Sequence, residues 1–97
     1  MRDPIAVIIR FSGDPDDLLE RFERARQLWI KAQDRDYKRP SFYAACKTDD
    51  GIAIISGWED AVAHRAFGQG LHPHIHAVGI GPPDRIERMR IAKPGWD

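Results

Sequence analysis

All four histidines of the chain lie between positions 64 and 76. Three of them, His72, His74 and His76, alternate with other residues in one short run that also contains Pro73. Histidine is the side chain that most readily binds a metal ion, ligates haem iron or accepts a proton near neutral pH. We therefore expect chemistry in this segment before any other, and His72 and His74 are the candidate catalytic residues.

Two regular geometries would bring these histidines together. In a strand, His72, His74 and His76 would share one face, although Pro73 would restrict that strand to the edge of a sheet. In a helix that begins with Pro73 at its first position, His72 and His76 would approach each other one turn apart. Either arrangement offers two imidazoles to a metal ion, but zinc needs three or four protein ligands and a third is not evident. Metal or haem binding through the histidine cluster therefore stays an alternative.

An irregular conformation is the third and favoured interpretation of the histidine run. The segment would then form a loop or cap over a pocket, with its histidines hydrogen-bonded or solvated. Other residues expected to line that pocket lie near strand ends or on the inner face of a helix, where pockets between a sheet and its helices form. The candidate pocket residues are Tyr43, Trp58, His64, Phe67 and His76.

The composition indicates one soluble domain spanning residues 1–97. Lysine plus arginine and aspartate plus glutamate both number 15, so the formal net charge is zero and neither nucleic acid nor an anionic membrane is an expected partner. Cys46 is the only cysteine, which excludes a disulfide within the chain. The first apolar run, Ile5 to Ile9, is far shorter than the ~20 residues of a membrane span. We therefore expect a cytoplasmic protein.

The first half of the chain predicts a strand followed by a long helix. Residues 5–11 alternate, but both faces are apolar over most of the length. Asp14 and Pro15 then form a helix start, with aspartates in the first turn. Apolar residues recur from Leu18 to Ala32 at helical spacing, so we predict an amphipathic helix that ends before Pro40.

The second half predicts a hairpin, a short helix and a last strand. Residues 42–48 and 52–58 flank an Asp-Gly turn and should form an antiparallel pair. Residues 61–67 show one apolar face and should form a helix that Gly68 and Gly70 end. Residues 85–92 favour an edge strand because charged side chains interrupt the apolar ones.

The resulting order is β-α-β-β-α-β, the ferredoxin-like arrangement of the α+β class. Both helices should cover one face of a four-stranded antiparallel sheet. The first and third strands also place isoleucines on the opposite face, as with Ile8 and Ile55. A large exposed apolar patch usually marks an interface, so we expect a homodimer formed through the sheets.

The sequence resembles the dimeric α/β-barrel proteins of the antibiotic-biosynthesis-monooxygenase type. The resemblance covers about residues 5 to 91 and rests on the alternating first strand, the helix start at residues 13–19, and Asp50 through Trp58 into the Ala/Phe helix at 63–67. It implies that two ferredoxin-like sheets close into a barrel across a dimer, each subunit keeping a pocket between sheet and helices. Family members include cofactor-free oxygenases, haem-degrading enzymes, isomerases and stress-associated proteins, so the resemblance implies the fold far more strongly than the reaction.

Haem degradation is the one activity that this resemblance argues against. The haem-degrading members use an asparagine in the first strand, a tryptophan within the second helix and a histidine just after that helix. His72, His74 or His76 could supply the histidine, but the chain contains no asparagine and Trp58 precedes the second helix. We expect no cofactor, while haem binding alone stays open.

Three classes of function remain. The leading hypothesis is a protein that binds a small apolar or aromatic molecule and acts as a cofactor-independent monooxygenase or isomerase, with a histidine as general base. The second is a noncatalytic stress-associated or ligand-sensing module. The third is an RNA-recognition module of the same element order, which the zero net charge and the lack of stacking aromatics on its central strands disfavour.

Overall fold

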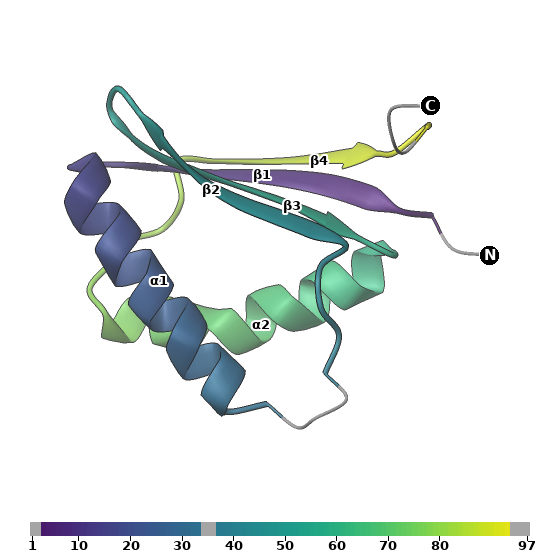
Figure 1. Cartoon of the computed structure of the whole chain (residues 1–97), viewed down its shortest axis with the longest axis horizontal. Coiled ribbons are helices and arrows are strands. Elements are labelled where there is room, and N and C mark those ends of the chain that lie inside the picture. The colour runs from purple at the N-terminus through teal and green to yellow at the C-terminus, as the bar shows by residue number, and fades with distance from the viewer. Residues whose placement is uncertain (1–2, 34–36, 94–97) are drawn as a thin grey trace.

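A computed structural model of the chain describes residues 3–33 and 37–93 and shows a four-stranded sheet with two helices (Figure 1). The element order is the predicted one. In chain order the elements are β1 (Ile5–Ser12), α1 (Pro15–Lys31), β2 (Phe42–Thr48), β3 (Gly51–Trp58), α2 (Ala61–Ala77) and β4 (Arg85–Arg90).

The sheet is antiparallel throughout, with the strand order β2-β3-β1-β4. Both helices lie on the same face of the sheet, and the opposite face carries no helix (Figure 1). The ferredoxin-like α+β fold is therefore confirmed. The two strands that are apolar on both faces, β1 and β3, are the central strands of the sheet.

The register divides the sheet into an inner face, which packs on the helices, and an outer face. Ile9 lies opposite Ile54 on the inner face, and Ile8 lies opposite Ile55 on the outer face. The inner face supplies much of the core, in which Val7 and Trp58 are almost completely buried. A single core therefore lies between the sheet and the two helices.

α1 begins as the sequence predicts. Asp14 is the N-cap residue and its carboxylate accepts a hydrogen bond from the amide of Asp16, while Pro15 occupies the first turn. The buried face consists of Leu18, Phe22, Ala25 and Trp29. The spacing of these four residues is the apolar stripe seen in the sequence, which turns this face toward the sheet.

α2 is much longer than the sequence predicts, and the expected end at Phe67 is wrong. The helix continues to Ala77 through two glycines and Pro73. Glycine and proline disfavour a helix interior by about 1 and 3 kcal/mol relative to alanine. The apolar repeat outweighs this cost, because Leu71 is buried in the core one turn after Phe67, and Ile75 packs against the core one turn later.

The end of α2 is fixed by a glycine and by a contact with α1. Gly79 has a φ of 82°, a left-handed conformation that favours glycine just beyond a helix. The guanidinium of Arg21 donates a hydrogen bond of 2.7 Å to the carbonyl of Val78. These features direct the chain from α2 into the loop before β4, which is the edge strand that the sequence predicts but ends at Arg90.

Within residues 3–33 and 37–93, no helix is both long and apolar enough to cross a membrane.

Candidate functional site

An apolar cavity of about 290 Å³ lies between α2, the β1–β4 side of the sheet and the loop that joins α2 to β4. The side chains of its wall come mainly from these elements and are largely aliphatic or aromatic. The wall includes Ile9, Phe11, Phe22, His64, Phe67, Leu71, His72, Ile75, His76, Ile80, Pro82, Pro83, Ile86 and Arg88. We take this hollow, called the inner cavity below, as the candidate site because apolar hollows with a few polar groups are typical ligand sites.

His64 is the buried polar residue of the inner cavity. It lies in the first turns of α2 and is only 6% exposed. Its ring packs edge-on to Trp58 at a centroid distance of 5.8 Å and also contacts Phe67. Its Nε2 atom is buried and has no hydrogen-bond partner among the described residues. Because buried polar atoms are nearly always hydrogen-bonded, this nitrogen is an open position for a ligand.

Burial and a nearby arginine keep the imidazole of His64 neutral. Desolvation lowers the pKa of His64 below its usual value of 6.5, and the positive charge of Arg88 lowers this pKa further. A neutral imidazole has one nitrogen that can accept a proton. At neutral pH His64 is therefore in the protonation state that a general base requires.

Arg88 reaches this site from β4. It lies opposite Val7 in the register, and Val7 belongs to the inner face of the sheet, so Arg88 points toward the helices. Its guanidinium forms no salt bridge with the residues that the structure describes. Arg88 also lines a second, open hollow of about 740 Å³, called the outer hollow below.

The outer hollow adjoins the inner cavity along α2. Both are lined by His64, Gly68, His72 and Arg88. The remaining residues of the outer hollow are Ala61, Arg65 and Gln69. The two hollows therefore share one boundary, with His64 and Arg88 on it.

The histidine run is helical, so the interpretations as a strand and as a loop or cap are both wrong. His72 and His76 lie one turn apart, as the helical alternative predicts, although Pro73 is inside α2 rather than at its start. His72 lines both hollows and His76 lines the inner cavity. His74 lines neither hollow, so it lies on a different side of α2 from His72 and His76.

The structure describes no third ligand that would complete a metal site at these histidines. Within the two described ranges, no three or more histidine, cysteine, aspartate or glutamate residues lie close enough together to hold a metal ion.

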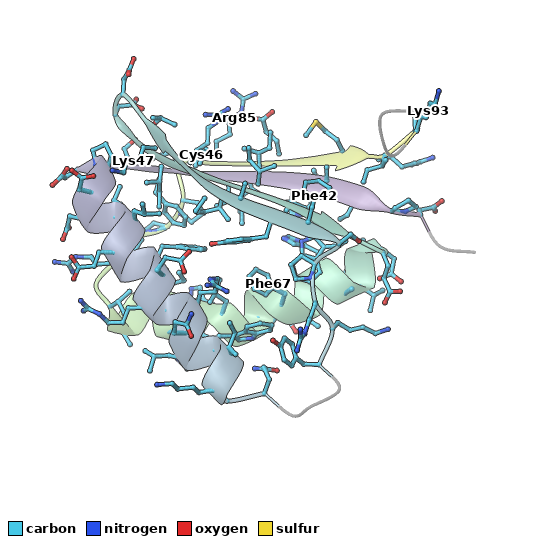
Figure 2. All side chains as sticks on the ribbon, in the orientation of Figure 1. Phe42, Cys46, Lys47, Phe67, Arg85 and Lys93 are labelled. Atoms are coloured by element: carbon cyan, nitrogen blue, oxygen red, sulfur yellow. The ribbon has the colours of Figure 1, made fainter. Side chains whose placement is uncertain are left out.

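Phe67 and Trp58 form an aromatic wall beside His64. Their ring centroids are 4.8 Å apart, and Figure 2 shows Phe67 between α2 and the sheet. The indole Nε1 of Trp58 donates a hydrogen bond of 2.8 Å to the hydroxyl of Ser56, and both residues are buried. Trp58 thus supports the wall without lining either hollow.

Tyr43 lies on the other side of Phe67, away from His64. It borders a third hollow of about 380 Å³ together with Trp29, Tyr37 and Phe67. The Tyr43 hydroxyl donates a 3.1 Å hydrogen bond to Glu23, and burial together with this carboxylate raises the pKa of Tyr43. The structure therefore brings together His64, Phe67, His72 and His76 but separates Tyr43 from them.

Two parts of the site are not anticipated from the sequence. Arg88 lies in a segment that the sequence predicts only as an edge strand. The one sequence feature that could have indicated its place in the site is its alternation with Ile86, because the two side chains share a face and both line the cavity. Ile80, Pro82 and Pro83 belong to a break between elements. They line the cavity because α2 extends to Ala77, so that the loop after it passes over the end of the cavity.

No family model matches this sequence. No curated protein matches it either.

Solved structures do match the fold over nearly the whole chain. A protein of unknown function from Nitrosomonas europaea, NE2512, has a TM-score of 0.70 at 16% identity, covering 98% of this chain and 95% of its own. The monooxygenase ActVA-Orf6 of Streptomyces coelicolor, in complex with nanaomycin D, has a TM-score of 0.64 at 18% identity, with coverages of 99% and 93%. SnoaB, a cofactor-independent oxygenase from Streptomyces nogalater, has a TM-score of 0.59 at 20% identity, with coverages of 97% and 96%.

The chain therefore shares its ferredoxin-like fold with these solved structures, two of which are monooxygenases or oxygenases. This confirms the resemblance seen in the sequence at the level of the fold. Proteins of this type carry different reactions on the same scaffold, so the function must be argued from the His64 site itself.

Proposed function

We propose that this chain binds a small apolar or aromatic molecule in the inner cavity and removes a proton from it with His64. The observation that carries the proposal is the buried Nε2 atom of His64, which has no hydrogen-bond partner at the wall of an apolar cavity. Arg88 lies on the same wall and supplies positive charge. His64 can therefore act as a base, and Arg88 can stabilise the anion that forms.

The proposed step is a proton transfer. A C–H or O–H bond of the substrate breaks, its proton forms a new N–H bond on the imidazole of His64, and the electron pair stays on the substrate as a carbanion or enolate. The guanidinium of Arg88 stabilises this anion. Phe67, which packs on Trp58, keeps water from one side of His64 and thereby strengthens the interaction of the imidazole with the substrate.

The anion can then react with molecular oxygen without a cofactor. For a methylene between two aryl groups, the overall reaction takes up O₂, replaces the two hydrogens by a carbonyl oxygen and releases water. The fold shared with SnoaB and with ActVA-Orf6 supports this choice, because the first is a cofactor-independent oxygenase and the second a monooxygenase. Isomerisation by return of the proton to another carbon is the alternative outcome of the same first step.

The later histidines of α2 have secondary roles or no role in this proposal. His72 lines both hollows and is positioned at the mouth of the cavity, where it can accept the proton from His64 or bind substrate. His74 lines neither hollow, so we assign it no role in the reaction. This choice differs from the expectation that His72 and His74 are the catalytic pair.

We also propose that the protein is a homodimer formed through the outer faces of two sheets. This face presents Phe42 and Met89, which are 48% and 43% exposed, beside Ile8 and Ile55. Figure 2 shows Phe42 on the sheet, with both helices on the other side. Two such faces would cover each other's apolar side chains and close a barrel.

The reaction is tested with 1,8-dihydroxyanthrone, whose methylene between two aryl rings is acidic. We expect oxygen uptake and formation of the quinone by the metal-free wild-type protein. The rate of the variant His64→Gln should be at least about tenfold lower, because a general base contributes about 10²–10⁴-fold to a rate. His74→Gln is the matched control and should keep the wild-type rate.

The same assay separates the proposal from a noncatalytic, ligand-sensing function. If the wild-type protein binds the anthrone but forms neither the quinone nor an isomer above the uncatalysed rate, the catalytic proposal fails and binding alone remains. If His64→Gln retains the full rate, His64 is not the base.

A further inference from the structure

The inner cavity and the outer hollow adjoin each other and differ in polarity. The boundary residues His64, Gly68, His72 and Arg88 belong to both. The inner part is walled by aliphatic and aromatic side chains, whereas the outer part is open. A molecule that occupied both would therefore have an apolar body and a polar end.

The outer hollow is positively charged and contains no acidic side chain in its wall. Arg65 and Arg88 line it, together with Gln69 and His72. Neither arginine forms a salt bridge with a residue in the ranges that the structure describes. The polar end of such a molecule would therefore meet two available guanidinium groups.

The arginines of α1 provide a contrast within the same chain. Arg21, Arg24 and Arg26 each form a salt bridge with a carboxylate of the same helix, at 2.9–3.0 Å. The arginines of the outer hollow have no such partner on α2 or on β4. Within residues 3–33 and 37–93 no carboxylate pairs with them, so their donors can bind an anion that comes from outside the chain.

We propose that the substrate is an amphiphilic acid. Its apolar body occupies the inner cavity, and its carboxylate binds Arg88 and Arg65 in the outer hollow. A guanidinium and a carboxylate can form two parallel hydrogen bonds, which fixes orientation as well as adding affinity. This assignment rests on the proposed function. A carboxylate bound to the two arginines would hold the body of the substrate beside His64.

The assignment is tested with a pair of probes that differ only in the head group. 2-Naphthoate and 2-naphthamide have the same aromatic body, but only the first is anionic at pH 7. By isothermal titration calorimetry we expect the wild-type protein to bind the acid at least about tenfold more tightly than the amide. The preference should shrink at high salt because the outer hollow is open to solvent.

Variants on β4 and α2 locate the head group. Arg88→Gln should remove the preference for the acid, Arg65→Gln should reduce it, and Arg88→Lys should keep part of it. Arg85→Gln is the control, because Arg85 lies on the outer face of the sheet (Figure 2) and already pairs with Glu87. Circular dichroism spectra matching the wild type would establish that each variant is folded.

The possible outcomes separate this inference from the proposed reaction. Equal affinity for acid and amide, an unchanged preference in Arg88→Gln, or no binding of either probe would overturn the head-group assignment, even where the anthrone reaction depends on His64. Conversely, a preference that depends on Arg88 combined with a rate that does not depend on His64 would leave the ligand class standing and overturn the reaction.

Discussion

His64 combines three properties that rarely occur together in one histidine: it is buried, its Nε2 atom has no hydrogen-bond partner among the described residues, and it lies near an arginine. The first and third lower its pKa, and the second leaves a nitrogen available to a ligand. Together they describe a neutral base held in an apolar wall. The sequence predicts His64 as a pocket residue, but nothing in its sequence context distinguishes it from the three histidines that follow.

The lowered pKa of His64 predicts how the stability of the fold depends on pH. The unfolded chain protonates this histidine near pH 6.5, whereas the folded chain does so only at lower pH. Between these two values the unfolded state binds more protons, so the free energy of unfolding should fall as the pH decreases below about 6.5. Urea titrations at several pH values would measure this slope.

The matched variants for this measurement are His64→Gln and His74→Gln. The first should flatten the pH dependence below about 6.5, and the second should leave it as in the wild type. An unchanged slope in His64→Gln would show that another group causes it.

Ser56 has a structural role behind the site. Its hydroxyl accepts the hydrogen bond of the Trp58 indole in a buried position. Ser56→Ala leaves this N–H without a partner and should lower the free energy of unfolding by about 1–3 kcal/mol. Ser41→Ala, at an exposed position, should change it by less than about 0.5 kcal/mol in the same denaturation experiment. A similar effect of both substitutions would argue against the buried bond.

At the level of elements, α2 shows where local sequence signals and burial disagree. Gly68, Gly70 and Pro73 all favour an earlier end of the helix, and the sequence prediction followed them. The apolar residues recurring every four positions from Ala63 to Ile75 are the competing signal, and their burial decides the outcome. The periodicity is visible in the sequence, but the area that it buries depends on the packing of α1 and the sheet.

The two glycines of α2 should respond in opposite ways to alanine. A Cβ atom at Gly70 would lie 2.8 Å from the indole nitrogen of Trp29, whereas a Cβ atom at Gly68 would have nothing within 4 Å. Gly68→Ala should therefore stabilise the protein by up to about 1 kcal/mol through helix propensity. Gly70→Ala should be destabilising because α1 and α2 must separate.

Thermal denaturation of the two variants compares these effects directly. Equal stabilisation by both substitutions would contradict the close approach of Gly70 to Trp29.

At the level of the whole molecule, the sequence predicts the fold better than the site. Alternating strands, a capped helix and an Asp-Gly hairpin are local signals, and together they establish the element order. The site depends on residues that are distant in the chain but line the same hollows, such as His64 and Arg88. The alternation with Ile86 indicates only that the two side chains share a face, and the register of β4 on β1 makes this the inner face.

The exposed apolar side chains on the outer face of the sheet predict a homodimer. Phe42→Glu places a charge on this face and should shift a dimer to monomers in sedimentation velocity at micromolar concentration. Leu28→Glu is the matched control, because Leu28 on α1 is exposed to a similar extent, 41% against 48%, but lies away from the sheet. A wild-type protein that sediments as a monomer would overturn the proposed homodimer.

The proposed transfer of a proton from a bound molecule to His64 can be observed by itself when oxygen is absent. Anaerobic mixing of the protein with 1,8-dihydroxyanthrone stops the reaction at the anion, whose absorption lies at longer wavelength than that of the neutral compound. We expect the wild-type protein and His74→Gln to produce this band at pH 7, while His64→Gln, at protein concentrations that bind the same amount of anthrone, does not. Appearance of the band at equal intensity with His64→Gln would contradict the account.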